Sequence, residues 1–373
     1  MKFNKWTLGL AAVGVVSLAS AARADEKVSQ LNTALSNTTL SGYVDVGAQY
    51  STATVGTYGP EAVKQDAFSL NVVDIALDKP LDATPFSAGY HVELWTAPGG
   101  TALGTGGLIR QAYLALGTTV GGQEIDWKIG VWDTLIGYEG LTSSGNPNYT
   151  HSYGFAIEPT THTGVQGTYK VNDEVTVQAG IADNEGANSA AINGVAAPTT
   201  GYALGSPELL ALVSFTAPDS WGAMKGATLS VGGTDNTDDS GSKNVYAGVT
   251  LPTPVTGLKV GAAYDYVAQA QIGNAGYVNV FGAYGTWTSS DSKFSLNLRG
   301  EYAHQSSGAA AAATLFNSTD GEEFTATASY ALWANVLSRV EVRLDHSTGA
   351  SYFEGGNFVQ NSVFLGAQLI YTF

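Results

Sequence analysis

Apolar and polar residues alternate with a period of two along most of the chain. In segment 43–50, Val44 and Val46 fall on one side, and Asp45 and Gln49 fall on the other. The alternation recurs in 86–94, 126–131, 175–181, 244–251, 294–302, 339–345 and 362–373, and less regular stretches fill 67–78, 108–117, 162–171, 207–217, 226–235, 257–267, 276–287 and 322–332. A period of two is the signature of a strand with one wet face. We therefore predict about sixteen strands of roughly 9–11 residues, the length that a tilted strand needs to cross a bilayer.

The connections between these strands alternate between short and long. The short ones lie at 78–84, 118–122, 171–173, 218–222, 252–257, 289–292 and 333–338. The long ones lie at 51–66, 97–107, 133–161, 183–205, 304–321 and 347–360, and two modest ones at 236–241 and 268–275 belong to the same series. Short periplasmic turns opposite longer external loops are typical of a membrane barrel. The chain is thus predicted to be an all-β, transmembrane, antiparallel up-and-down β-barrel with both termini periplasmic.

Aromatic residues gather at the predicted strand ends. Phe86, Tyr169, Phe215, Trp287, Phe294, Tyr330, Tyr371 and Phe373 fall at the periplasmic ends, and Tyr50, Phe68, Tyr264, Tyr277, Tyr302 and Phe324 fall at the outer ends. Aromatic residues are common in strands generally. Their concentration at the ends favours the two interfacial girdles of an outer-membrane barrel.

The first 24 residues have the features of a secretory signal peptide. Lys2 and Lys5 precede an uncharged apolar run from Trp6 to Leu18, and Ala22-Arg23-Ala24 forms a small-x-small cleavage site. The run is shorter than the roughly 20 apolar residues of a membrane-spanning helix. We predict three parts: a signal peptide at 1–24, a short periplasmic segment at 25–38, and a barrel at 39–373.

Composition agrees with export. The chain has no cysteine, so no disulfide can mispair, and only 13% of its residues are charged, whereas soluble domains usually carry about 25%. The net charge is −16, and the predicted leader is basic, so the exported chain is more acidic still. This acidity excludes a nucleic-acid binder with a basic face. No later segment resembles a transmembrane helix, so a spanning structure has to be a closed barrel.

One region carries a more specific pattern. It reads Ile129-Gly130-Val131-Trp132-Asp133-Thr134, then Asn146-Pro147-Asn148-Tyr149-Thr150-His151-Ser152, and then Glu158-Pro159-Thr160-Thr161-His162-Thr163-Gly164-Val165. It resembles the hallmark region of the second β-barrel porin group of bacterial outer membranes, which has G-x-x-D-T, N-P-N-Y-S-R-S-like and P-x-x-H-T-G-V segments. Thr150 and His151 stand where that family tends to have serine and arginine. The resemblance implies an outer-membrane diffusion channel for small solutes.

The sequence gives little support for a catalytic site or a metal site. The five histidines are His91, His151, His162, His304 and His346, and no nucleophile motif accompanies them. His151 and His162 match no metal-site spacing, so hydrogen bonding is the favoured role. The acidic turn 235–241 lacks the twelfth-position glutamate of a calcium loop. We predict no enzyme activity, no catalytic residues, no cofactor and no metal.

The predicted site is the pore. By parity Arg299, Arg339 and Arg343 face the lumen with Glu301 and Glu341, and Asp45, His91, Glu93, Asp126 and Lys128 are also lumen-facing. The long connection 133–161 could fold inward and offer Asp133, Glu139, His151 and Glu158 to the arginines across a constriction. The alternative is a paired ladder that stiffens the wall. The external loops are assigned five further acids that would attract cations at the mouth, namely Asp235, Asp238, Asp239, Glu322 and Glu323.

These inferences define an outer-membrane porin with weak cation preference. The alternative is a plugged barrel that serves as an adhesin or structural protein. The expected partners are outer-membrane lipid, small hydrophilic solutes, and the barrel-assembly machinery through the C-terminal strand ending at Phe373, without nucleic acid. Fold-level analogy suggests a homotrimer.

Overall fold

The computed structural model describes residues 37–53, 67–96, 109–183, 207–237, 242–271, 274–306, 315–354 and 356–373. The predicted signal peptide and nearly all of the segment 25–38 lie outside these residues. So do the whole glycine-rich connection at 97–107 and part of the acidic turn 235–241.

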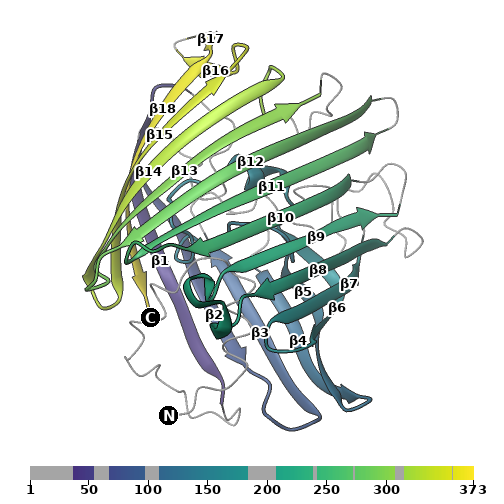
Figure 1. Ribbon diagram of the computed structural model, residues 1–373. Coiled ribbons are helices and arrows are strands. Elements are labelled where there is room, and N and C mark those ends of the chain that lie inside the picture. Colours follow the sequence, from purple (N-terminus) through teal and green to yellow (C-terminus); the bar gives the residue numbers. More distant parts are fainter. Residues whose placement is uncertain are drawn as a thin grey trace.

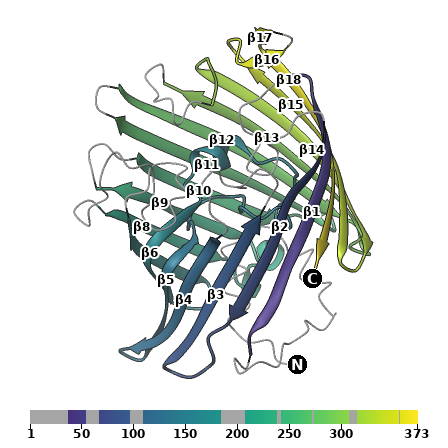
Figure 2. The ribbon, with the colours of Figure 1, turned by 180° about the vertical axis from the view of Figure 1, so that it is seen from behind.

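Sixteen strands of the described chain close into one antiparallel barrel, as the sequence predicted (Figures 1 and 2). Each strand pairs with its neighbours along the chain, and the ring closes where β1 pairs with β18. The strands are β1 Thr39–Ser51, β2 Ala67–Lys79, β3 Ser87–Thr96, β4 Ile109–Val120, β5 Gln123–Asp133, β6 Thr161–Lys170, β7 Val175–Ala182, β8 Glu208–Thr216, β9 Thr228–Asn236, β10 Ser242–Pro252, β11 Leu258–Gln271, β12 Asn274–Thr288, β13 Phe294–Gln305, β14 Asp320–Trp333, β15 Val336–Ser347 and β18 Asn361–Thr372.

The two ends of the barrel differ in their connections. The short turns and the C-terminus lie at one end, where a 3₁₀ turn, η2 (Asp219–Met224), joins β8 to β9. The connection between β15 and β18 lies at the other end and contains a small hairpin, β16 (Tyr352–Glu354) and β17 (Asn357–Val359), which the sequence had not predicted (Figure 1). We call the first end the turn side.

Side chains alternate between the two faces of the barrel wall. Leu296 and Leu298 on β13 and Val340 and Val342 on β15 are exposed on the outer face, whereas the residues between them are buried inside. A soluble barrel does not leave such a belt of large apolar side chains exposed, but lipid covers it in a membrane. The described residues contain no helix that is both long and apolar enough to span a membrane.

Three register shifts interrupt the ladders of the described strands, one between β14 and β15 at Ala331 and Trp333 and two on the inner wall near the N-terminal strands. Glu93 pairs with Gln111 and Leu94 with Ile109, so Arg110 has no cross-strand partner, and Asn71 is skipped in the same way opposite Asp45 and Val46. A bulge turns two successive side chains to the same face. Arg110 is consequently buried beside Gln111, and Asn71 beside Val72.

The connection between β5 and β6 folds into the barrel. It contains a single helical turn, α3 (Tyr153–Ile157), which the sequence had not predicted and which Ser152 caps by accepting a hydrogen bond from the backbone of Phe155. Its apolar side chains enter three buried clusters against the inner wall. In the first cluster, Leu135, Ile136 and Tyr138 pack against β7, β8 and β10–β12. In the second, Leu141 and Phe155 pack against β1–β3 and β18. In the third, Tyr153 and Ile157 pack against β11–β13.

Candidate functional site: the inward loop and the lumen wall

We call residues 134–160 the inward loop. Its ends are joined where the backbone N–H of Thr134 donates to the carbonyl of Thr160 over 3.0 Å. The ring of His162 contacts the Thr134 hydroxyl and the Glu208 carboxylate, each at 3.0 Å, and Asp133 pairs with Arg110. The segments Asp133-Thr134 and His162-Thr163 of the porin-like sequence pattern therefore form the base of this loop.

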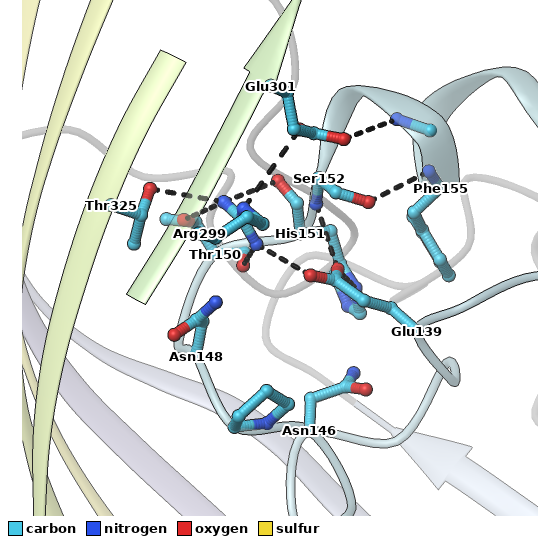
Figure 3. A network of polar contacts seen from close by, with 12 residues as sticks. Glu139, Asn146, Asn148, Thr150, His151, Ser152, Phe155, Arg299, Glu301 and Thr325 are labelled. Atoms are coloured by element: carbon cyan, nitrogen blue, oxygen red, sulfur yellow. Dashed lines mark hydrogen bonds and ion pairs between the residues drawn. The ribbon is translucent and has the colours of Figure 1, made fainter. Parts of the chain in front are cut away.

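Arg299 on β13 holds the middle of the inward loop (Figure 3). Its guanidinium lies 2.7 Å from Glu139 of the loop and 2.8 Å from Glu323 of β14, and it donates to the carbonyl of Thr150 over 2.7 Å. The side chain is 0% exposed. One buried arginine thus ties two loop segments and the wall together through charge-assisted hydrogen bonds.

Two arginines of β15 bind further carbonyl groups of the loop. Arg339 donates to the carbonyls of Ser143, over 2.8 Å, and Asn146. Arg343 donates to the carbonyl of His151 over 2.6 Å. These loop carbonyls lie outside regular secondary structure, so the arginines supply hydrogen bonds that a buried backbone requires.

Two wall glutamates bind the N–H groups of the same segment. Glu341 accepts from the backbone of Tyr149 (2.6 Å) and Thr150 (3.0 Å). Glu301 accepts from Tyr153 and Gly154, the first two residues of α3, whose N–H groups have no intrahelical partner (Figure 3). Acids and bases of the wall thus each bind backbone groups of the same loop segment.

The Asn-Pro-Asn-Tyr segment makes complementary contacts. The Pro147 carbonyl accepts from Asn297 over 3.0 Å, and Asn148 accepts from the Thr327 hydroxyl over 2.9 Å. The Tyr149 ring lies against Gly366, where a Cβ atom would come within 2.6 Å of it. The segment is therefore shaped to dock on β13, β14 and β18.

Two buried carboxyl groups of the inward loop, Glu139 and Glu158, have different charged neighbours. Burial raises the pKa of a carboxylic acid, but Arg299 and His151 outweigh that effect and hold the pKa of Glu139 at about 2. Glu158 differs, because burial and then the charges of Asp265, Glu139 and Glu301 raise its pKa well above the ordinary value. Glu158 Oε1 and Asp265 Oδ1 are both buried without a hydrogen-bond partner. These two carboxyl groups form a second buried pair, without an arginine.

The predicted constriction residues therefore fall into separate groups. Glu139, Arg299, Glu301, Arg339, Glu341 and Arg343 meet in one buried network, and His151 lies 3.3 Å from Glu139 and stacks on Phe155. Two placements in the sequence analysis are wrong, since Asp133 pairs with Arg110 and Glu158 lies beside Asp265. Glu323, assigned to an external loop, is also corrected: it lies on β14, is buried and pairs with Arg299.

Sequence reasoning missed several residues of these groups. Arg110 is buried by a bulge, which simple alternation does not show. Asp265 had a usable signal, because it alternates with Tyr264 and Tyr266 in a strand-like segment.

A second polar group lines β2–β5. His91 lies 3.1 Å from Asp78 and 3.3 Å from Glu93, and Glu93 lies 2.6 Å from Arg110. Lys128 Nζ lies 4.8 Å from the centre of the Tyr113 ring. Asp126 lies two residues from Lys128 on β5 and is half-buried, whereas Asp45 is buried beside the inward loop, where it accepts from Ser143. Within the described residues, no three His, Cys, Asp or Glu side chains are grouped in a way that could hold a metal ion.

A closed barrel of sixteen antiparallel strands with an apolar outer face, a polar inner face and a loop folded into its lumen defines an outer-membrane porin barrel. A family model described as "Putative beta-barrel porin-2, OmpL-like" matches residues 37–373, and the chain belongs to this family.

Solved porins share the fold. The anion-selective porin from Comamonas acidovorans has a TM-score of 0.62 at 11% identity, over 90% of this chain and 99% of that one. The outer membrane channel DcaP of Acinetobacter baumannii has a TM-score of 0.59 at 15% identity, over 90% and 97%. OmpT of Vibrio cholerae in its trimer form has a TM-score of 0.59 at 15% identity, over 90% and 99%. At these identities the likeness concerns the fold alone. No curated protein matches the sequence.

Proposed function

We propose that the chain is a passive diffusion channel of the outer membrane for small hydrophilic solutes and ions, without enzymatic activity. The observation that carries the proposal is the polar lumen of a closed sixteen-strand barrel in a chain of the porin-2 family. A channel for hydrophilic solutes needs a polar inner face.

A weak preference for cations is part of this proposal. The acids Asp78 and Asp133 keep 41% and 37% of their side chains exposed, and Asp126 is half-buried. The arginines of the inner wall are buried against the inward loop, so they contribute less to the field that a solute meets. The excess of exposed acid favours cations.

A plugged barrel remains the second candidate, and the burial of the inward loop favours it. Wall side chains from β1, β2, β8 and β10–β15 are covered by this loop. In that case the protein would serve as an adhesin or a structural element rather than as a channel.

Planar-bilayer recording of the purified full-length protein distinguishes the two candidates. A channel gives discrete conductance steps, and a salt gradient gives a reversal potential of the sign expected for cation preference. The absence of steps above those of protein-free membranes would reject the channel and favour the plugged barrel. Clear anion selectivity would reject the charge argument while keeping the channel.

A further inference from the structure

The inner wall is covered unevenly by the inward loop. Most inward side chains of β11–β15 are buried beneath the loop. On the turn side of β3–β6, His91, Tyr113, Asp126, Lys128 and Thr168 remain half-buried. We call these five residues the turn-side patch. Since their side chains keep contact with solvent inside the barrel, a solute that enters from the turn side meets them.

The turn-side patch has an aromatic floor. His91 stacks on Tyr113 with 5.3 Å between ring centres, and Lys128 Nζ lies over the same Tyr113 ring. A cation–π contact holds an ammonium group in place without neutralising it. Among the described residues, no carboxylate forms an ion pair with Lys128, in contrast to Arg110 and Arg299, which are both paired with acids. Lys128 therefore offers a positive charge to a ligand.

Thr168 adds a hydroxyl group on the neighbouring strand β6. Its hydroxyl oxygen accepts from the side-chain amides of Gln166 and Gln178, each over 3.4 Å. With the oxygen engaged by two donors, the hydroxyl hydrogen is left to donate. Strand pairing places Thr168 directly opposite Asp126, and Gln166 opposite Lys128. The Lys128 ammonium lies on the other side of β5, over Tyr113 of β4.

Asp126 supplies the opposite charge. It lies two residues from Lys128 on the same face of β5, which corresponds to about 7 Å along the strand. Asp78 of the neighbouring ladder is also exposed to the lumen. A simple anion would be repelled by these acids, and a simple cation by Lys128. A small molecule with both charges matches the pattern.

We infer that the turn-side patch binds small zwitterions, of which free α-amino acids are the simplest class. The carboxylate of the ligand lies at Lys128, and its ammonium group lies toward Asp126. This inference rests on the proposed function, in that it names a solute class for the same lumen. It makes Lys128 and Asp126 specificity-determining residues, whereas the buried arginines hold the loop.

The first test compares two isomers, alanine and lactamide, which share one formula but differ in charge. Swelling rates of proteoliposomes in isosmotic solutions give an alanine-to-lactamide ratio, corrected with protein-free liposomes. A single unit charge about 7 Å away in water changes the local concentration of a charged group about threefold. We expect the ratio to fall about threefold in Lys128→Gln and in Asp126→Asn. Lys259→Gln, an exposed lysine at the turn-side start of β11, is the matched control and should keep the wild-type ratio.

The second test measures binding without transport. Saturation-transfer NMR on the full-length protein in detergent should detect alanine with the wild type and lose the signal in Lys128→Gln. Swelling with an unchanged ratio in both variants, together with unchanged NMR signals, would overturn the binding site and leave the channel standing. Binding that depends on Lys128 in a protein that admits neither solute would reject the channel and support the site.

Discussion

Replacing Arg299 by glutamine should release the inward loop from the wall. The substitution removes the buried charge that Glu139 and Glu323 share, and it leaves the Thr150 carbonyl without its donor. Breaking a buried ion pair from one side costs about 3–5 kcal/mol, because the remaining charge stays buried without a partner. Here two carboxylates are affected. The strands of the barrel are joined by their own ladders, so this cost falls on the loop.

The direct measurement is amide hydrogen exchange of residues 134–160. A loss of about 3 kcal/mol in the free energy of opening accelerates exchange by about two orders of magnitude. Amides of β13 and β14 should keep wild-type rates, which provides the internal control. Glu139→Gln should have a smaller effect, since Arg299 then keeps Glu323. If exchange in the loop is unchanged in Arg299→Gln, apolar packing alone holds the loop and the reasoning is wrong.

The same ion pair gives a dependence on pH. The pKa of Glu139 is held at about 2, below its value in a solvated loop. A depressed carboxyl pKa contributes stability above the ordinary value of about 4.3, and this contribution is lost as pH falls toward 2. Loop exchange in the wild type, expressed relative to the intrinsic exchange rate at each pH, should therefore accelerate below about pH 4, and Glu139→Gln should lack this response.

Three further outcomes are expected. Because the pKa of Glu158 is raised, its contribution to the stability of the docked loop is complete below about pH 4 and is lost as pH rises. Glu158→Gln should therefore slow loop exchange at neutral pH. Faster exchange would show that Glu158 is ionised there. Leu298, exposed on the outer face, should not tolerate arginine, since a charge at the bilayer midplane costs about 2–4 kcal/mol, and normal assembly of Leu298→Arg in membranes would place it away from lipid. On intact cells an impermeant thiol reagent should label Thr237→Cys but not Thr256→Cys, and the opposite pattern would invert the predicted orientation.

The barrel could be predicted because a strand with one wet face shows a local alternation of apolar and polar residues. Alternation around Leu298 and Val342 places Arg299 and Arg343 on the inner face, and the structure has the same arrangement. The number of strands followed from counting such segments. Bulges escaped prediction, because one skipped residue such as Arg110 changes the facing of its neighbours without a distinctive composition.

A local sequence pattern does not show which group of the protein covers an inward-facing side chain. Parity states that Arg299 faces the lumen, but water or another segment can occupy that space. The inward loop occupies it, so the arginine meets Glu139 and two backbone segments. Glu158 was misplaced for the same reason, since it reaches β11 through the path of a 27-residue loop that no periodicity describes.

The loop is joined to the wall by charge for a physical reason. A closed barrel with a polar inner face cannot hold an irregular loop by apolar packing alone, because the loop buries unpaired N–H and C=O groups where it contacts the wall. Long side chains from β13 and β15 reach these groups, the arginines at carbonyls and the glutamates at N–H groups. Both signs of charge are therefore needed on the same wall, whatever the charge of the solute. It follows that the charges buried under the loop serve docking, whereas the half-buried pair Lys128 and Asp126 bears on which solutes pass.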